Sequence, residues 1–255
     1  MTIQWITHNN NYYCNEQPTF VQSGNVVTVL QELYHLQTSL SLIFDRLGIT
    51  QEIQENLSLD ELSPQEQDQL TFLIEKFEFG IKEIRQNPTH LEQGFDQRLF
   101  VRLGNYFYYK GNLSQALEYY NLSSLIDENE WAYFNSARIL QLQDQLDTAF
   151  VKYDQAIKLK PDFSQALCFQ AKILLHKGNS KKALEKLKKS QQLNPNDPET
   201  NKLIANYYIE HGEDKEALIH LKAIHHRDPD VTTQIEELEQ KNSFLNRLIG
   251  RFRKR

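Results

Sequence analysis

The side chains of this sequence best suited to catalysis or metal binding are eight histidines and two cysteines, and their spacing argues against both activities. His211, His220, His225 and His226 cluster toward the C-terminal end, but no acidic or cysteine partner stands near them at the spacing of metal ligands. Histidines near helix C-termini are also favoured by the helix dipole. No glycine-rich phosphate loop and no nucleophile motif is present. We therefore expect no enzymatic activity, no metal site and no cofactor.

The composition is that of an ordinary globular protein built mainly of helices. Hydrophobic residues make up 40% of the chain and charged residues 24%, while glycine (9) and proline (7) are few. Cys14 and Cys168 lie far apart in unrelated contexts, which favours a reducing compartment over a disulfide framework. The first residues lack the basic start of a signal peptide, and no apolar stretch approaches the ~18 residues of a membrane span. We expect a soluble, cytoplasmic protein.

Charge is distributed unevenly along the chain. Residues 1–94 carry 4 basic and 13 acidic side chains, a formal charge of −9, whereas residues 95–255 carry 24 basic and 21 acidic ones, a charge of +3. Leu47–Glu52 is weakly similar to the start of a DNA-binding helix-turn-helix, but it falls in the acidic part. Because DNA binding depends on neutralising phosphates and no basic recognition helix follows, we do not expect nucleic-acid binding there.

An internal repeat sets the elements that must position any binding residues. Three alanines stand 34 residues apart, and prolines, glycines and a second set of alanines follow the same step, with a fourth copy upstream that is one residue shorter. Small residues let the two helices of a unit approach closely, the glycines stand where the first helix must stop, and the prolines cannot continue the second helix. The sets are Ala149, Ala183 and Ala217; Ala137, Ala171 and Ala205; Pro161, Pro195 and Pro229; Gly178 and Gly212; and, upstream, Gly104, Gly111 and Ala116.

This pattern resembles the tetratricopeptide repeat over residues 97–230. The resemblance implies an all-α fold, a right-handed α-solenoid of helix–turn–helix units within residues 95–230. The first unit departs from the pattern because Ile126-Asp127-Glu128-Asn129 replaces its terminal proline. The four units implied are 97–129, 130–163, 164–197 and 198–231.

The flanks of the repeats also carry helical patterns. We expect residues 1–94 to form a separate acidic region with helices at about 25–47 and 64–86, the second beginning at a capping box, Ser63-Pro64-Gln65-Glu66. Residues 1–24 show no period and are expected to be irregular. Because a repeat array needs ends that cover its apolar faces, residues 232–255 are expected to form a capping helix with a basic tail.

The family resemblance also implies where a partner would bind, because the first helices of successive units line a concave groove in this family. By phase, Asn105 and Asn135 match two asparagines with which many peptide-binding members hold a ligand backbone, since an amide both donates and accepts. The alternative is that each bonds a neighbouring helix. The groove residues implied in this way are Arg98, Arg102, Asn105, Tyr108, Trp131, Phe134, Asn135, Arg138, Phe169 and Lys172.

One ligand class is excluded in this register. Members that bind the C-termini of heat-shock chaperones use a two-carboxylate clamp of lysine and arginine, and its basic positions fall on Val101, Gln165 and Phe169, which are uncharged. Four groove cations beside aromatic residues still favour an acidic or acidic–aromatic partner. For each of them the alternative is a solvated side chain over the groove wall. They are Arg98, Arg102, Arg138 and Lys172.

Three hypotheses for function follow. The leading one is a non-enzymatic scaffold, such as an adaptor, assembly factor or chaperone-like protein, that binds a partner segment in the groove. The alternative is a membrane-surface-associated or nucleic-acid-linked regulatory factor that uses the basic C-terminal helix, or else that helix end is simply solvated. A third is that the acidic N-terminal region lies over the groove and regulates access. The C-terminal cations are Arg247, Arg251, Arg253, Lys254 and Arg255.

Overall fold

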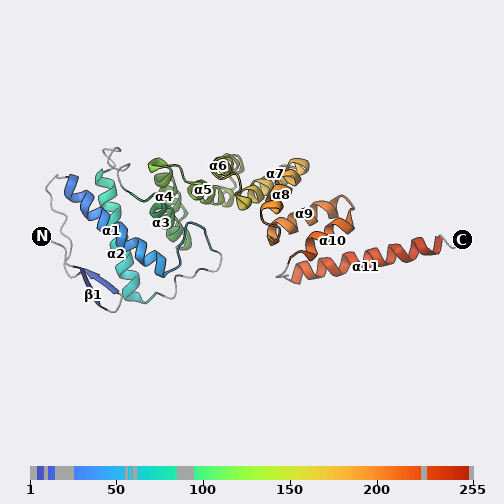
Figure 1. The fold of residues 1–255 in the computed structure, drawn as a ribbon, viewed down its shortest axis with the longest axis horizontal. Coiled ribbons are helices and arrows are strands. Elements are labelled where there is room, and N and C mark those ends of the chain that lie inside the picture. The colour runs from blue at the N-terminus through green and yellow to red at the C-terminus, as the bar shows by residue number, and fades with distance from the viewer. Residues whose placement is uncertain are drawn as a thin grey trace. The chain divides into compact units, whose positions relative to one another are not determined.

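The chain forms two compact groups of helices. The structure, a computed structural model, describes residues 5–8, 11–14, 26–54, 57, 59, 62–84, 95–224 and 229–252, with side chains over 32–54, 57, 59, 62–82, 95–224 and 229–243. The two groups are residues 1–135, called unit 1, and residues 136–255, called unit 2. The division falls inside helix α5 (Glu130–Leu142). Figure 1 shows the order of the elements along the chain.

Unit 1 differs in extent from the acidic region expected to end at residue 94. It includes the first repeat, α3 (Gln97–Tyr109) and α4 (Leu113–Ile126), because this pair shares one core with the N-terminal helices. Phe77 from the N-terminal region contacts Phe95 and Phe100, with ring centroids 6.4 and 5.7 Å apart. A boundary at 94/95 would cut through this aromatic cluster, so the N-terminal region and the first repeat form one packed body.

The two N-terminal helices are α1 (Val26–Arg46) and α2 (Pro64–Ile84). The capping box predicted at Ser63 is present, since the Ser63 N–H donates to Glu66 Oε2 (3.0 Å) and the Glu66 N–H donates to Ser63 Oγ (3.3 Å). The Ser63 hydroxyl also donates to Glu66 Oε2 (2.8 Å), and this bond, together with the one from the Ser63 N–H, holds the pKa of Glu66 below its usual value. The helix α1 ends before Gly48, whose φ of +69° is the left-handed conformation that glycine adopts most readily.

The expectation that residues 1–24 are irregular is wrong for two short segments. Strands β1 (Trp5–His8) and β2 (Asn11–Cys14) pair antiparallel, with Trp5 opposite Cys14 and His8 opposite Asn11. Aromatic and β-branched residues favour strands. Each strand has only four residues, too few for an alternation of apolar and polar side chains to be recognised in the sequence.

Unit 2 continues the helix pairs of the repeats. Along the chain from α6 to α11, each helix contacts the next. The residues predicted to allow close packing are buried as expected, and Ala137, Ala171, Ala205 and Ala217 have no exposed surface. The helices are α6 (Leu146–Leu159), α7 (Ser164–His176), α8 (Ser180–Leu193), α9 (Pro198–Glu210), α10 (Asp214–Lys222) and α11 (Pro229–Phe252). The predicted fold class, an all-α array of helix–turn–helix units, is confirmed, with the hairpin as an addition.

The turn inside each repeat uses a left-handed residue. Gly111, Gly178 and Gly212 have φ values of +74°, +72° and +73°, as their place at the end of the first helix predicts. In the second repeat the equivalent residue is Asp144, with φ +59°. Aspartate is among the few residues with a side chain that adopt this conformation readily, so a repeat without the glycine keeps the same turn.

The last helix covers the end of the repeats in unit 2. Val231, Ile235 and Leu238 of α11 are buried in one cluster with Ala217 and Leu221 of α10. Two ion pairs hold the same helix, Lys222 with Glu239 at 2.7 Å and Lys241 with Asp214 at 2.7 Å. The side chains of residues 244–252, and residues 253–255, lie outside the description, so the basic tail stays a prediction. No described helix is long and apolar enough to cross a membrane.

Candidate peptide-binding groove

Three of the groove residues predicted in unit 1 hydrogen-bond to a non-helical piece of the same chain, namely Arg102, Asn105 and Asn135. This piece, residues 49–54, directly follows α1 and Gly48 and is called the resident segment. Arg102 on α3 donates from Nε to the Ile49 carbonyl (2.6 Å) and from Nη2 to the Ser41 carbonyl (3.1 Å) and Asp45 Oδ1 (2.7 Å). Its guanidinium also lies 5.4 Å from the centre of the Phe44 ring. Arg102 therefore joins the end of α1 to the start of the resident segment.

The two predicted asparagines bind the main chain of the resident segment. Asn105 Nδ2 donates to the carbonyl oxygens of Thr50 (2.7 Å) and Gln51 (3.0 Å), and Asn135 Nδ2 donates to the same Gln51 oxygen (2.8 Å). Asn135 Nδ2 also donates to Asn105 Oδ1 at 2.9 Å. These distances are those of ordinary hydrogen bonds. The segment oxygens that accept from these two amides are backbone carbonyls, so these particular hydrogen bonds do not depend on which side chains the segment carries.

Three further residues complete the site, and the sequence alone did not identify their roles. Tyr120 on α4 donates its hydroxyl proton to Asn105 Oδ1 (2.7 Å) and so fixes which end of the amide faces the segment. Asn129 Nδ2 donates to Gln51 Oε1 (3.0 Å), and the Gln54 N–H donates to the Tyr109 hydroxyl (2.7 Å). Asn129 also caps α5, because its Oδ1 accepts from the N–H groups of Trp131 and Ala132. In the sequence, Asn129 ends the four residues that replace the terminal proline of the first repeat, and this departure from the pattern could have pointed to it.

The resident segment is anchored by two apolar side chains as well as by hydrogen bonds. Ile49 is 1% exposed and belongs to the core of unit 1, and Ile53 is 5% exposed. Thr50 between them is exposed. Asn105 and Asn135 have no exposed surface, so the amide pair lies beneath the segment and not on the outer surface. Asn105 also accepts from Tyr120 of the neighbouring helix α4, so both asparagines make structural hydrogen bonds within unit 1, and their role toward a partner stays a prediction.

A cavity of about 480 Å³ lies beside the resident segment, and Arg98 and Arg102 are among the residues that line it. Arg98 is exposed and pairs with Asp96, the N-cap of α3, at 2.9 Å. Although partial burial works in the opposite direction, the hydrogen bonds from Arg98 hold the pKa of Asp96 below its usual value. Asp45 and Asp96 thus already pair with the two arginines, so the cavity has no large excess of positive charge.

A second group of predicted residues comes together in unit 2. The ring of Phe169 on α7 stacks on Tyr153 with centroids 5.8 Å apart, and the cationic groups of Arg138 and Lys172 lie 5.6 and 5.3 Å from its centre. Lys172 also pairs with Glu199 of α9 at 2.6 Å. We call Arg138, Phe169 and Lys172 the cation–aromatic cluster. It combines a π face with two positive charges, an arrangement typical of binding hot spots.

The remaining predicted groove residues are placed less favourably for a ligand. Phe134 is 2% exposed and contacts Trp131 edge to face at 5.9 Å, so its ring belongs to the core. Trp131 is half-buried in this contact. Tyr108 contacts Tyr109 edge to face at 6.0 Å and is likewise half-buried. These three aromatics support the first helices more than they offer a surface.

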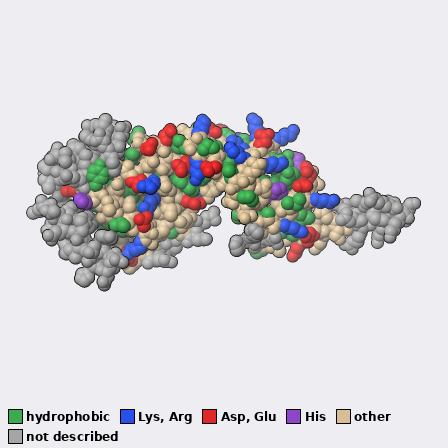
Figure 2. All heavy atoms as spheres, viewed as in Figure 1, with side chains coloured by type: hydrophobic (Ala, Val, Ile, Leu, Met, Phe, Trp, Pro, Cys, Tyr) green, Lys and Arg blue, Asp and Glu red, His purple; other side chains and the backbone are tan. Residues whose placement is uncertain are grey.

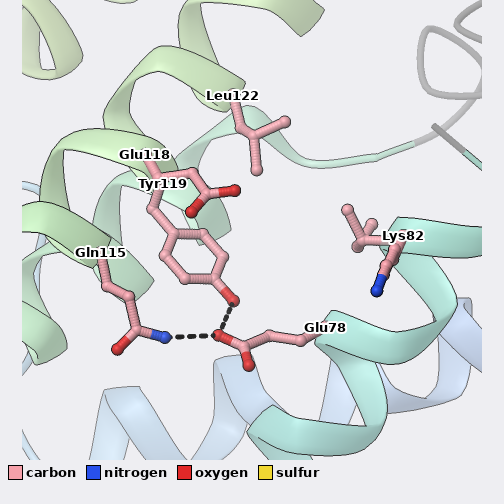
Figure 3. A pocket seen from close by; sticks show the side chains of 7 residues that line it. Glu78, Lys82, Gln115, Glu118, Tyr119 and Leu122 are labelled. Atoms are coloured by element: carbon pink, nitrogen blue, oxygen red, sulfur yellow. Dashed lines mark hydrogen bonds between the residues drawn. The ribbon is translucent and has the colours of Figure 1, made fainter.

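A second cavity, of about 310 Å³, lies between α2 and α4 (Figure 3). Glu78 reaches into it from α2, and its Oε1 accepts from Gln115 Nε2 (3.1 Å) and from the Tyr119 hydroxyl (2.8 Å). Lys82 and Glu118 line the same space. The carboxylate is therefore used to join the N-terminal helices to the first repeat, and the contacts explain this cavity as part of the packing of unit 1.

The histidine cluster is structural where it is described. His220 Nδ1 lies 2.8 Å from Gln191 Nε2, and its ring stacks on Tyr208 at 5.6 Å. His225 and His226 lie outside the described residues. Within the described part of the chain, no three His, Cys, Asp or Glu side chains gather in a way that could hold a metal ion. Burial raises the pKa of the Cys168 thiol to about 12, which makes it a poor nucleophile.

From the environment of His220 we expect the free energy of unfolding of unit 2 to depend on pH. Burial, with a smaller contribution from Lys188, lowers the pKa of His220, although Glu216 opposes the shift. Neutral imidazole can accept from the Gln191 amide, whereas the protonated ring cannot. The contribution of His220 to the free energy of unfolding is therefore fully present above the ordinary histidine pKa of about 6.5. It is lost as the pH falls through the lowered pKa of His220 in the folded protein. Urea unfolding between about pH 7.5 and about pH 5 should show this loss, and His220→Gln should flatten it while His211→Gln should not.

From the contacts of Arg102 we can predict how strongly this residue holds the resident segment. Replacing it with lysine keeps the charge but removes the fork that donates to two carbonyls and Asp45, so unit 1 should lose about 1.5 kcal/mol. Hydrogen exchange at residues 49–54 should become faster. Arg98→Lys is the matched control, because Arg98 is 65% exposed and pairs only locally with Asp96. Equal effects of the two substitutions on exchange would contradict the role assigned to Arg102.

Comparisons with known proteins agree with this architecture. A family model described as "Anaphase-promoting complex, cyclosome, subunit 3" matches residues 142–224. The solved structure titled as a functional characterization of Pseudomonas aeruginosa pilF is 15% identical, with a TM-score of 0.59 and coverage of 84% of this chain and 86% of that one. A tetratricopeptide repeat protein from Parabacteroides merdae is 16% identical, with a TM-score of 0.56 and coverage of 89% and 78%. A MamA protein structure is 16% identical, with a TM-score of 0.52 and coverage of 85% and 95%.

None of the curated proteins matches the chain. At these identities the solved structures establish a shared fold and nothing about ligands. The helix pairs, the left-handed turn between the helices of each pair, the buried small residues at a 34-residue step and the matching family model all agree. The chain has the fold of tetratricopeptide repeat proteins.

Proposed function

We propose that this protein is a non-enzymatic interaction scaffold, of the adaptor, assembly-factor or chaperone-like kind, that binds an extended segment of a partner protein. The observation that carries the proposal is the amide pair, Asn105 and Asn135, which already holds a stretch of main chain through its carbonyl oxygens. A surface that binds a backbone in this way can accept many sequences. In the following repeats Phe169 stands in phase with Asn135, and Arg138 and Lys172 stand in phase with Asn105, so the proposal for unit 2 rests on these side chains and not on an amide pair.

The cation–aromatic cluster supports an acidic or acidic–aromatic partner. A partner carboxylate would pair with Arg138 or compete with Glu199 for Lys172, whose side chain is 34% exposed. A partner aromatic ring would contact Phe169 beside the two cations. The uncharged positions Val101 and Gln165 argue against the carboxylate clamp that binds chaperone C-termini. Figure 2 shows Lys and Arg side chains interspersed with Asp and Glu on the face drawn, so charge alone does not mark the binding face.

The test is a charge reversal in unit 2 of the full chain. The probe is a fluorescein-labelled peptide of alternating Glu and Phe, compared with one of alternating Lys and Phe. Arg138→Glu with Lys172→Glu should weaken binding of the acidic peptide at least about tenfold. Lys181→Glu with Lys182→Glu changes the charge equally on exposed positions of α8 and should weaken it less than about threefold. Equal losses in the two double variants would contradict the proposed site.

A second candidate function is favoured by the basic end of α11. The helix runs from Pro229 to Phe252, and Arg247 and Arg251 lie in its last turns. Such a helix could attach a cytoplasmic protein to an anionic membrane surface or to nucleic acid. Deleting residues 247–255 and measuring binding to anionic vesicles and to duplex DNA tests this candidate. The scaffold proposal predicts that the deletion leaves binding of the acidic peptide unchanged.

A further inference from the structure

The resident segment, residues 49–54, occupies the amide pair in the way that a bound peptide would. Its hydrogen bonds to Asn105 and Asn135 use the carbonyls of Thr50 and Gln51, and neither bond involves a side chain of the segment. A partner segment with the same backbone conformation would make the same bonds. The amide pair therefore cannot hold a partner while the resident segment is in place.

The anchors of the resident segment define what a competitor must offer. Ile49 and Ile53 are both buried, four residues apart, and the two bonded carbonyls lie between them. A competitor needs a stretch that can adopt the same backbone conformation, with apolar side chains at these two positions. Thr50, which directly follows the first anchor Ile49, is exposed, so the site sets no requirement for the side chain at this position.

The resident segment is joined to α1 at two points where a local change could release it, the turn at Gly48 and the ion pair of Arg102 with Asp45. Gly48 must adopt a φ of +69° for the chain to leave α1 and enter the site, and the N–H of Ile49 then donates to the Phe44 carbonyl at 2.9 Å. The ion pair that reinforces this turn, Arg102 with Asp45, has its carboxylate side 68% exposed. The exposed carboxylate makes the ion pair itself sensitive to salt, whereas the Arg102 side chain is 13% exposed and keeps its bonds to the Ile49 and Ser41 carbonyls. Opening can occur at the turn while α1 stays in the core.

We propose that residues 49–54 are an intramolecular ligand of the Asn105–Asn135 site, which a partner segment with the same backbone conformation and two apolar residues four apart must displace. This inference rests on the proposed scaffold function, because it names what regulates access to the first part of the groove. Release requires movement about Gly48. Any modification or partner that pulls residues 45–48 away would open the site.

The test uses a labelled peptide of residues 47–54 added in trans to full-length protein. Gly48→Val disfavours the left-handed conformation, while its Cβ would meet only Leu57 Cδ1 at 3.7 Å, an ordinary contact. This variant should bind the peptide about tenfold more tightly than the wild type. Gly111→Val is the matched control, because Gly111 has a φ of +74° and no atom within 4 Å of its Cβ position. It carries the same backbone strain away from the segment and should bind like the wild type.

Adding Asn135→Ala to Gly48→Val should remove the gain in peptide affinity. A second measurement covers the case in which Gly48→Val does not fold. In the wild type, the peptide at about 1 mM, comparable with the effective concentration of a tethered segment, should speed hydrogen exchange at residues 49–54. Equal peptide binding by the two glycine variants, or exchange that the peptide does not change, would overturn the inference. The probe contacts unit 1 only, so failure of the acidic peptide at Arg138 and Lys172 would leave these results unaffected.

Discussion

Replacing Asn105 with alanine is expected to lower the free energy of unfolding of unit 1 by about 3–4 kcal/mol. The side chain has no exposed surface and takes part in four hydrogen bonds, two to the resident segment, one from Tyr120 and one from Asn135. Alanine would leave the buried hydroxyl of Tyr120 without its acceptor and the Thr50 carbonyl without its donor, whereas the Gln51 carbonyl would keep its bond from Asn135. The measurement is urea unfolding of the full chain, followed by hydrogen exchange on peptides from residues 95–135.

Asn135→Ala is the matched control for this prediction. Asn135 donates to Gln51 and to Asn105 but has no hydrogen bond at its buried Oδ1. Its replacement should cost about 1–2 kcal/mol, because fewer partners are left unsatisfied. Both substitutions should speed exchange at residues 49–54. Equal losses for the two asparagines, or an unchanged exchange rate at the segment, would show that Asn105 is not the centre of the site.

Gly104→Ala is expected to destabilise unit 1 by about 2–3 kcal/mol, even though alanine is the better helix former. A Cβ at this position would lie 2.3 Å from Tyr120 Cε1 and 2.5 Å from Tyr120 Cδ1. The Tyr120 ring is fully buried, and its hydroxyl is bound to Asn105. The ring must therefore move, and the orientation of the Asn105 amide is lost with it. Thermal unfolding and hydrogen exchange at residues 49–54 measure both consequences.

Gly80→Ala provides the comparison for Gly104→Ala. Its Cβ would lie 2.6 Å from Leu33 Cδ2, the far end of a flexible side chain. Because a leucine methyl can rotate away whereas the bonded tyrosine ring cannot, Gly80→Ala should cost less and should leave exchange at the resident segment unchanged. If Gly80→Ala were the more harmful substitution, the link from Gly104 through Tyr120 to Asn105 would be wrong.

The repeat architecture was predictable because its signals are local. Each unit places a small residue on both helices and a left-handed residue at the turn, within a span of 34 residues. The buried Ala171 and Ala183 and the turn at Gly178 follow from this phase alone. The left-handed turn at Asp144 was not predictable from residue type, because this repeat has an aspartate where the others have a glycine, although the backbone conformation is the same.

The occupant of the groove was not predictable in the same way. Phase placed Asn105 and Asn135 where a ligand backbone would be held, but the residues that they bind lie 54, 55 and 84 positions away in the sequence. Those bonds end on main-chain carbonyls, which leave no mark on residue type. The hypothesis that the N-terminal region covers the groove came from charge, whereas the contacts in unit 1 are mainly amide–carbonyl bonds and buried isoleucines.

The extent of unit 1 has a similar explanation. The repeat pattern runs from the first repeat into the second with a step of 33 residues and without the terminal proline, and neither departure predicts that the compact units divide inside α5. Phe95 and Phe100 pack against Phe77 of α2 and draw the first repeat into the N-terminal core. Contacts between distant segments therefore decide the grouping of helices that the repeat pattern places in series.

The central claim, that the chain holds its own residues 49–54 on the Asn105–Asn135 pair, can be tested in solution by NMR. The side-chain amide protons of Asn105 and Asn135 should show nuclear Overhauser effects to protons of Thr50 and Gln51, because the donor–acceptor distances are 2.7–3.0 Å. The Gln54 N–H, which donates to Tyr109, should exchange slowly. Absence of these effects, together with exchange at residues 49–54 as fast as in an unstructured peptide, would contradict the account.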